Sequence, residues 1–172
     1  VDRRQRQMCI RDRNWTSKSL SVESYRRGLC LSQNGARVFL TTVNGYCYMS
    51  ENSGNSWTKI TAIPYGAYYA ARSSTNFSRI FTADTQNSPN SKLWYSLDGG
   101  TNWSSLAQPS GGGNLGVIID CDADGEYFVG QACDGDKYLY GTKYPFISWF
   151  VLEAVSRGWP NERTGVLVRR RK

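Results

Sequence analysis

Hydrophobic and polar positions along this chain fall into short runs that are separated by turn residues. Each run is rich in β-branched or aromatic side chains and is bounded by Gly, Asn, Asp, Ser or Pro. Such runs predict β-strands, because β-branched and aromatic residues pack well on a pleated sheet and the bounding residues favour turns. The predicted strands cover residues 16–20, 28–31, 37–42, 45–49, 58–63, 67–72, 79–83, 92–95, 104–107, 115–121, 126–131, 137–140 and 150–155.

These runs repeat with a period that tryptophans mark. Trp15, Trp57, Trp103 and Trp149 are 42, 46 and 46 residues apart. Four strands per period of this length is the spacing of a propeller blade, and such a sheet must stack on neighbours to bury both faces. The predicted fold is therefore all-β: a partial β-propeller of about three four-stranded antiparallel blades in residues 14–155. Core tryptophans placed by chance would not keep so constant a spacing.

Two polar, glycine-rich turns stand directly before a tryptophan. They read Ser96-x-Asp98-x-Gly100-x-Asn102-Trp103 and Ser50-x-Asn52-x-Gly54-x-Ser56-Trp57. Both resemble the Asp-box, or bacterial neuraminidase repeat, of sialidase-like propellers, whose pattern is Ser-x-Asp-x-Gly-x-Thr-Trp. Asn14-Trp15 resembles the end of another copy, whereas residues 141–149 occupy the fourth place without the acid and the glycine pair.

The residue types of these boxes suit a structural turn. A short acid or amide accepts hydrogen bonds from its own turn, glycine supplies positive φ, and tryptophan packs on the sheet. The resemblance implies that the boxes lie on the blade periphery, between the third and fourth strands or just before the final edge. Asp98 is accordingly expected to be structural rather than catalytic.

The resemblance covers binding proteins as well as sialidases and other glycoside hydrolases. A sialidase centre needs an arginine triad, a Tyr–Glu pair and an acid, and neither Arg72 nor Arg79 can be assigned to such a triad. No catalytic residue is therefore assigned. We expect a binding or scaffold module for a glycan or protein ligand, in an extracellular, cell-surface or virion-associated setting. The alternative is part of a sialidase-like hydrolase whose catalytic residues lie elsewhere, and a reading frame that contains the triad would favour it.

Three acids, Asp120, Asp122 and Asp124, precede a glycine at alternate positions. This spacing resembles the opening of a calcium loop. An EF-hand would need an acidic twelfth ligand, and Gln131 stands there. The segment also aligns with the plain hairpin at residues 32–35, so a turn is favoured over Ca²⁺ and no cofactor is expected.

The cysteines are expected to be buried free thiols. Apart from Cys9, they show no spacing typical of a metal site, and a buried free thiol is the usual state of such a cysteine. They are Cys30, Cys47, Cys121 and Cys133.

A set of aromatics on the fourth run of each repeat could stack on sugars if exposed, although packing between blades is favoured. They are Tyr46, Tyr48, Trp94, Tyr138 and Tyr140.

The formal charge of +7 resides at the two ends of the chain. Residues 1–13 carry +3 and residues 157–172 carry +5, which leaves −1 for the middle. A nucleic-acid interface should lie on the folded face, so none is expected. No apolar run has the eighteen or so residues of a membrane helix.

The two ends depart from the repeat. Residues 8–13, Met-Cys-Ile-Arg-Asp-Arg, resemble a translated transposase adapter of the kind used in sequencing libraries. Residues 1–13 are thus expected to be a non-native leader, with a disordered basic arm as the alternative, and the chain a fragment whose parent contains further blades. Residues 156–172 are expected to be a basic tail, either solvated or out of frame.

Deleting residues 1–13 should leave the folded content unchanged, because a leader of this kind takes no part in the sheet. Far-ultraviolet circular dichroism of the full and shortened chains checks this. A loss of β signal on deletion would contradict the leader interpretation.

Overall fold

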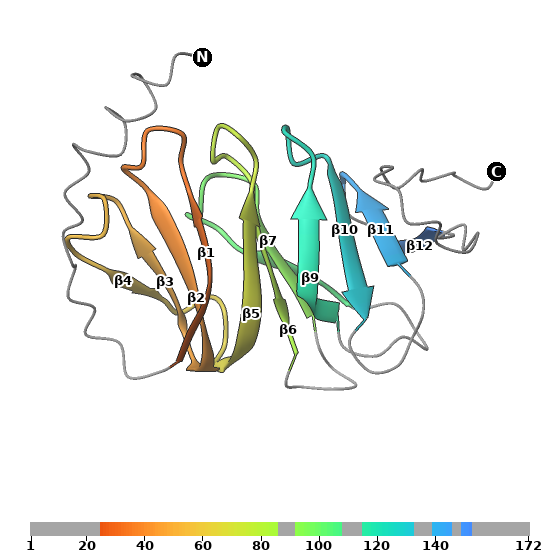
Figure 1. Cartoon of the computed structure of the whole chain (residues 1–172), viewed down its shortest axis with the longest axis horizontal. Coiled ribbons are helices and arrows are strands. Elements are labelled where there is room, and N and C mark those ends of the chain that lie inside the picture. The colour runs from red at the N-terminus through yellow and green to blue at the C-terminus, as the bar shows by residue number, and fades with distance from the viewer. Residues whose placement is uncertain (1–24, 86–91, 108–114, 133–138, 146–148, 153–172) are drawn as a thin grey trace, which may run out of the picture.

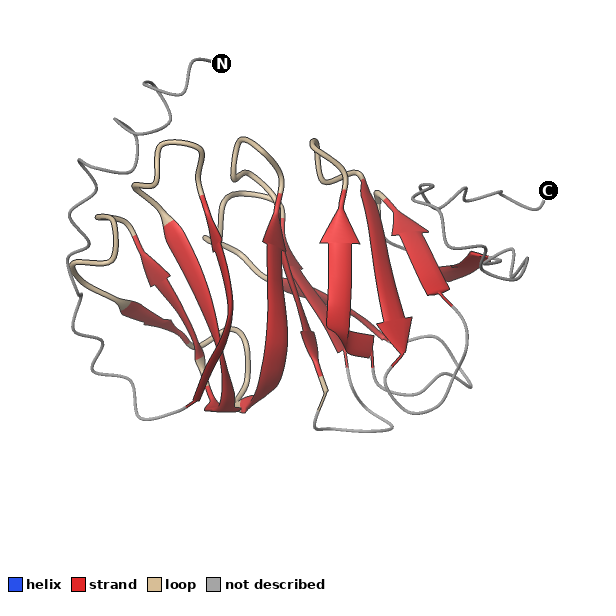
Figure 2. Ribbon diagram, viewed as in Figure 1, coloured by secondary structure: helices blue, strands red, loops and turns tan. Residues whose placement is uncertain are grey.

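Every regular element that the structure describes is a β-strand. The computed structural model describes residues 25–85, 92–107, 115–132, 139–145 and 149–152, and Figure 2 shows strands joined by turns and loops. In these ranges no helix is long and apolar enough to cross a membrane. The strands are β1 (Tyr25–Leu31), β2 (Val38–Gly45), β3 (Cys47–Ser50), β4 (Thr58–Ile60), β5 (Gly66–Ser73), β6 (Ile80–Asp84), β7 (Lys92–Ser96), β8 (Ser104–Ala107), β9 (Leu115–Cys121), β10 (Tyr127–Ala132), β11 (Leu139–Lys143) and β12 (Trp149–Leu152).

The strands fall into three consecutive antiparallel blades of four strands, which confirms the predicted fold class. Blade 1 is β1–β4, blade 2 is β5–β8 and blade 3 is β9–β12, and each strand pairs with the next one within its blade. The blades stand side by side in chain order (Figure 1). β2 also pairs with β5 at Val43↔Ala67 and Gly45↔Gly66, so blades 1 and 2 are hydrogen-bonded to each other.

Most strand boundaries lie within a few residues of the predicted ones. Residues 104–107 and 115–121 are strands as predicted. The run at 58–63 ends earlier, at Ile60, because the chain turns before Pro64. Tyr46 was expected on a strand but lies between β2 and β3, and Asn44, near the end of β2, has a φ of 57°. The predicted strand at 16–20 and Trp15 lie outside the described residues.

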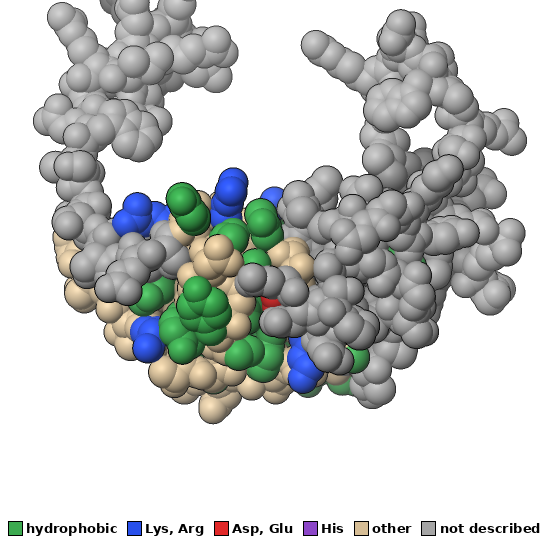
Figure 3. Space-filling view, turned by 90° about the horizontal axis from the view of Figure 1, so that it is seen from below, with side chains coloured by type: hydrophobic (Ala, Val, Ile, Leu, Met, Phe, Trp, Pro, Cys, Tyr) green, Lys and Arg blue, Asp and Glu red, His purple; other side chains and the backbone are tan. Residues whose placement is uncertain are grey.

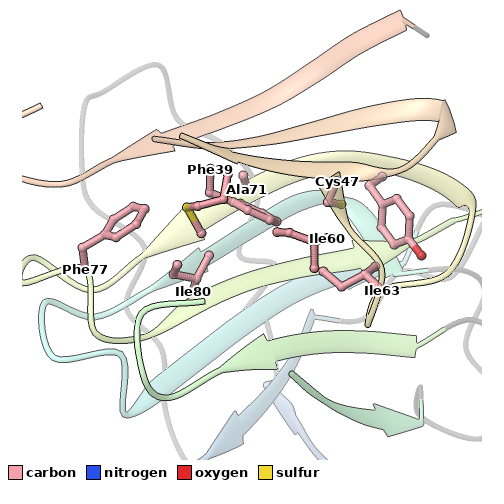
Figure 4. Packing of buried hydrophobic residues seen from close by; sticks show 9 residues of the cluster. Phe39, Cys47, Ile60, Ile63, Ala71, Phe77 and Ile80 are labelled. Atoms are coloured by element: carbon pink, nitrogen blue, oxygen red, sulfur yellow. The ribbon is translucent and has the colours of Figure 1, made fainter. Parts of the chain in front are cut away.

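A buried apolar layer separates blades 1 and 2 (Figure 4). Ile63, from the loop between the blades, is fully buried in this layer, and its exclusion from water favours stacking of the two sheets. Blade 1 contributes Phe39, Cys47, Met49 and Ile60, and blade 2 contributes Tyr68, Ala71, Phe77 and Ile80.

A second layer lies between blades 2 and 3. The rings of Phe81 and Phe128 meet across it with centroids 5.3 Å apart. Ile80 and Phe81 are neighbours in β6, yet Ile80 faces blade 1 and Phe81 faces blade 3. This follows from the two-residue period of a strand, which sends successive side chains to opposite faces. Blade 2 is therefore apolar on both faces.

Gly28 allows β1 to pack directly on the backbone of β5. A Cβ atom there would lie 2.6 Å from the amide nitrogen of Ala71 and 2.8 Å from the carbonyl carbon of Ala70. The Gly28 N–H donates to Thr41 Oγ1 at 2.8 Å, and this pair is buried. The first strands of neighbouring blades are thus too close for a side chain at this position.

Gly28→Ala should destabilise the fold by about 1–3 kcal/mol, the usual cost of overpacking a close-packed interior. The matched control is Gly35→Ala, because Gly35 has a φ of 69° but nothing lies within 4 Å of its Cβ position. That control tests backbone strain alone, with an expected cost of about 1 kcal/mol. Urea unfolding measures both. A Gly28→Ala variant as stable as the parent chain would contradict the close approach of β1 to β5.

Candidate functional site

The box in blade 2 is a turn between β7 and β8 that its own side chains hold closed. The buried Ser96 hydroxyl accepts the Gly100 N–H at 2.7 Å and donates to Asp98 Oδ1 at 2.9 Å. Asp98 Oδ1 also accepts the backbone N–H groups of Thr101 (3.1 Å) and Asn102 (2.8 Å). The Asn102 side-chain amide donates to Asp98 Oδ2 at 2.6 Å.

These hydrogen bonds stabilise the ionised form of Asp98. The backbone N–H of Asn102 makes the largest contribution, and together the donors lower the pKa of this carboxyl below its ordinary value. Both oxygens are occupied within the turn. A carboxylate in this state is a poor proton donor at neutral pH.

The box in blade 1, between β3 and β4, makes the same turn with an amide in place of the acid. Asn52 Oδ1 accepts the Ser56 N–H at 2.8 Å, and Ser50 Oγ accepts the Gly54 N–H at 2.8 Å. One bond runs in the opposite direction, since Asn52 Nδ2 donates to the Ser56 hydroxyl at 2.8 Å. The turn therefore needs an acceptor oxygen at this position rather than a charge.

Each box ends in a tryptophan that closes back on its glycine. The indole N–H groups of Trp57 and Trp103 donate to the carbonyls of Gly54 (3.1 Å) and Gly100 (3.0 Å). Gly54 and Gly100 have φ angles of 81° and 96°. Glycine adopts such positive φ angles readily because it has no Cβ atom. The Trp103 ring also stacks on Phe39 of blade 1, with centroids 5.2 Å apart. The box of blade 2 thus contacts the neighbouring blade.

Arg37 is a residue whose role sequence reasoning missed. Its guanidinium makes two hydrogen bonds to Glu51 of blade 1, at 2.7 and 3.0 Å, and one to the Gly99 carbonyl in the box of blade 2. It also lies 5.2 Å from the ring centroid of Phe77. A repeated turn could have revealed the position. It reads Ser32-x-Asn34-x-x-Arg37 in blade 1 and Ser74-x-Asn76-x-x-Arg79 in blade 2.

The three candidate calcium ligands lie around the corresponding turn of blade 3. Asp122 Oδ1 accepts the Tyr127 N–H at 3.0 Å, as Ser32 Oγ accepts the N–H of Arg37 in blade 1. Asp120, in β9, lies 3.3 Å from the Arg72 guanidinium, and Asp124 is exposed in the turn. Within the described ranges, no group of three His, Cys, Asp or Glu side chains is placed to hold a metal ion.

Two hollows open between blades 1 and 2. One has a volume of about 540 Å³ and lies between the β1–β2 and β5–β6 turns, with Asn34, Asn76 and Phe77 in its lining. The other has a volume of about 380 Å³ and lies between β4 and the box of blade 2, with Trp103 and Lys59 in its lining. Both are open to solvent and have mixed polar and apolar linings, and neither brings together a pair of carboxylates.

The aromatics of the fourth run have different environments. Trp94 packs on the core between blades 1 and 2, Tyr48 is half-buried and Tyr140 is buried, whereas Tyr138 lies outside the described residues. Tyr46 differs because it lies at the end of the blade opposite the boxes.

Tyr46 meets two residues from other segments. The Tyr65 ring stands edge-on to it with centroids 5.6 Å apart, and the Lys59 ammonium lies 4.4 Å from its ring centroid. We call Tyr46, Lys59, Pro64 and Tyr65 the tyrosine patch. Figure 3 views this end of the molecule, where apolar side chains gather with basic side chains around them.

The backbone that carries the tyrosine patch is tied to the core. Thr42 Oγ1 donates to the Tyr46 carbonyl at 2.8 Å, and the Tyr68 hydroxyl donates to the Pro64 carbonyl at 2.9 Å. Ile63, one residue before Pro64, is fully buried. The patch is therefore exposed but preorganised, since Tyr65 is 55% exposed on a loop that the core holds.

Cys30, Cys47 and Cys121 are free thiols, and Cys133 lies outside the described residues. Burial raises the pKa of Cys30 to about 12 and that of Cys121 to about 11, and it raises the pKa of Cys47 well above the ordinary value. The thiolate is the reactive form of cysteine. These three side chains are therefore poor nucleophiles at neutral pH.

Comparisons with known proteins show the fold. No protein-family model and no curated protein sequence matches the chain. A solved structure of YCF48 from Cyanidioschyzon merolae matches 81% of this chain and 40% of its own, at 20% identity and a TM-score of 0.66. A structure of YCF48 bound to D1 peptide matches 82% of this chain and 44% of its own, at 18% identity and a TM-score of 0.64. The GH74 xyloglucanase from Xanthomonas campestris matches 73% of this chain and 21% of its own, at 17% identity and a TM-score of 0.54.

These likenesses show that the described blades are part of a β-propeller. The chain spans less than half the length of each of these three solved structures. At such low identity the likeness carries over the architecture alone.

Trp103→Ala should destabilise the fold by about 3–5 kcal/mol, as truncation of a packed aromatic does. Trp57→Ala is the matched control, because Trp57 makes the same bond to its own turn. We expect a smaller loss there, since Trp103 also stacks on Phe39 of the adjacent blade. Thermal and urea unfolding of both variants measure the difference. A loss near zero for Trp103→Ala would refute its anchoring role.

Proposed function

We propose that this chain is the binding part of an Asp-box propeller, and that it takes a glycan or protein ligand on the tyrosine patch. The observation that carries the proposal is the fixed geometry of Tyr46, Tyr65 and Lys59 at one end of the blades. Two aromatic rings and a cation meet there from three separate segments. The core holds their backbone in place.

The chemistry of the patch suits recognition. Tyrosine provides a large apolar face and a polar hydroxyl at low cost in conformational entropy, which makes it frequent where proteins bind ligands. Such a ring can stack on a sugar or anchor a side chain of a protein partner. Lys59 adds a positive charge beside the rings, which favours a ligand that carries a carboxylate.

The geometry of the two boxes supports the proposed relationship to Asp-box propellers. Both boxes form closed turns from the residues that the repeat pattern names, with Asn52 and Asp98 as acceptors. The comparisons support the general role, because one of the propellers matched is described as bound to a peptide. Another is a xyloglucanase, so the same fold also serves an enzyme that acts on a glycan.

In the alternative, a sialidase-like hydrolase, the catalytic residues would be other than Asp98 and Arg37. The Asp98 carboxylate serves its own turn, and Arg37 serves Glu51 and the box of blade 2. A hydrolase would therefore take its carboxylate pair and its arginines from other residues. Release of sialic acid from sialyllactose by the chain would favour this alternative over a binding role.

Tyr65→Ala should weaken ligand binding by about tenfold to thirtyfold, the loss expected for a central aromatic contact. Three probes are tested on the folded 172-residue chain: sialyllactose, xyloglucan oligosaccharides and an array of overlapping peptides. Isothermal titration calorimetry then measures the affinity of any probe that binds.

The matched control is Tyr127→Ala. Tyr127 is 43% exposed and has the Lys143 ammonium 4.9 Å from its ring centroid, yet it lies on blade 3. This variant should keep full affinity. Equal losses in the two variants, or no loss in Tyr65→Ala, would refute the tyrosine patch as the binding site.

A further inference from the structure

Three equivalent turns of the repeat share one conformation, and one of them differs from the others at a single position. The β1–β2, β5–β6 and β9–β10 turns lie at the same end of the blades (Figure 1). In each turn, the side chain of the first residue accepts the backbone N–H of the sixth. The fourth residue has a positive φ in all three turns: 69° for Gly35, 59° for Phe77 and 67° for Gly125. Phe77 is thus a bulky residue at a position where the other two turns have glycine.

The backbone conformation of Phe77 is unfavourable for a large side chain, because a Cβ atom crowds the backbone at positive φ. Such a conformation persists only where the surroundings hold it in place, and it is frequent at binding sites. The surroundings of Phe77 meet that condition. It is 1% exposed within the apolar layer between blades 1 and 2, and the Arg37 guanidinium lies over its ring. Phe77 is therefore a candidate for a residue that shapes a site.

The turn of blade 2 is bonded to the turn of blade 3 but not to the turn of blade 1. The Thr75 N–H donates to the Ala123 carbonyl of blade 3 at 2.8 Å. Among the described residues, no hydrogen bond joins residues 32–37 of blade 1 to residues 74–79 of blade 2. The hollow of about 540 Å³ lies between these two turns instead, and Phe77 is in its lining. The buried Phe77 ring thus underlies a hollow that opens where the turns are apart.

Two asparagine amides in the lining of this hollow are held in a fixed orientation. Asn34 Oδ1 accepts the Ala36 N–H at 3.1 Å, and Asn76 Oδ1 accepts the Ser78 N–H at 3.0 Å. Each of these oxygens also accepts the hydroxyl of the serine that begins its turn, at 2.8 Å. Neither Nδ2 atom donates to another group among the described residues. Each turn therefore uses the acceptor of its amide and leaves the N–H donors available to a ligand.

The charge of the lining adds to the effect of these donors. Among the described residues that line the hollow, Arg37 is basic and none is acidic. Glu51 and the Gly99 carbonyl accept hydrogen bonds from Arg37 Nε and Nη2, whereas Nη1 makes none to the described residues. A ligand that accepts hydrogen bonds and carries negative charge is complementary to such a lining. A carboxylate has both properties, and its hydrogen bonds are stronger than those of neutral acceptors.

We propose that the hollow between the β1–β2 and β5–β6 turns binds a hexuronate, with its carboxylate held by the amides of Asn34 and Asn76 beside Arg37. This is a second site, at the end of the blades opposite the tyrosine patch. Its volume of about 540 Å³ lies in the range of pockets that take small ligands, about 300–1,000 Å³. The hexuronate is recognised as the free acid or as one residue of a polysaccharide.

The lining favours a sugar acid over an acidic peptide. A peptide is usually anchored by an apolar side chain in a desolvated pocket. The apolar residues of this lining are Ala36 and Phe77, and Phe77 is 1% exposed, so they offer no such pocket. The exposed side chains of Gln33 and Thr75 provide an amide and a hydroxyl instead, which suit the hydroxyl groups of a sugar ring.

Isothermal titration calorimetry of the 172-residue chain with galacturonate and trigalacturonate tests the proposal. Both should bind, and galactose should bind at least tenfold more weakly than galacturonate, because it lacks the carboxylate. Asn34→Asp and Asn76→Asp should each weaken the binding of galacturonate about tenfold or more, since each replaces the N–H donors by a negative charge. Aspartate keeps the acceptor oxygen that the turn uses, and Asp124 already occupies the equivalent position in blade 3. The fold should therefore survive, which circular dichroism checks.

The matched control is Asn44→Asp, which adds the same charge at the other end of the blades. Asn44 is exposed and has a φ of 57°, a conformation that aspartate also tolerates. This variant should keep full affinity for galacturonate. Absence of galacturonate binding, equal affinity for galactose, or unchanged affinity in Asn34→Asp and Asn76→Asp would each overturn the proposal. An equal loss in Asn44→Asp, or tighter binding of a tetraglutamate peptide than of trigalacturonate, would also overturn it.

Discussion

The whole arrangement depends on the burial of both faces of every sheet. In β6, Ile80 and Phe81 are adjacent and both fully buried, yet they pack on opposite neighbours. A four-stranded sheet with two apolar faces cannot be stable alone in water, because one face would always remain exposed. Stacking of the blades is therefore the condition for folding of each blade. The exposed Leu29 and Val129 show the same constraint at the two ends, where the described residues provide no further blade.

The boxes and Arg37 act around this apolar contact, at the periphery. Trp103 stacks on Phe39, and Arg37 joins Glu51 of one box to Gly99 of the next. An exposed ion pair contributes little by itself, so the value of Arg37 lies in directing the two turns toward each other. The exchange of Asp98 for Asn52 between the boxes shows that the turn requires an acceptor and tolerates loss of the charge. In both boxes the side-chain oxygen at this position accepts hydrogen bonds from within its own turn.

The two ends of the blades differ in what their connections do. At one end, the Ser32, Ser74 and Asp122 side chains accept backbone N–H groups and so close the short turns. The boxes at the same end are closed by hydrogen bonds of their own. At the other end, the β2–β3 turn and the loop before β5 place Tyr46 and Tyr65 in contact on the surface. A rigid scaffold that presents side chains from its loops is a common basis for binding. The proposed function rests on this division.

Local chemistry determined which features the sequence could predict. The tryptophan spacing, the alternation within strands and the turn residues predict the succession of strands and about three blades in residues 14–155, because each depends on residues near one another in the chain. Contacts between distant segments required the tertiary structure. Arg37 and Gly99 are 62 residues apart, and Tyr46 meets Lys59 and Tyr65 only when β2, β4 and the following loop are in place. Leu29 pairs with Leu40 in blade 1 as Ile119 pairs with Gly130 in blade 3, so these two similar residues hold equivalent positions. Only the packing of blade 3 on blade 2 buries Ile119, whereas Leu29 is exposed.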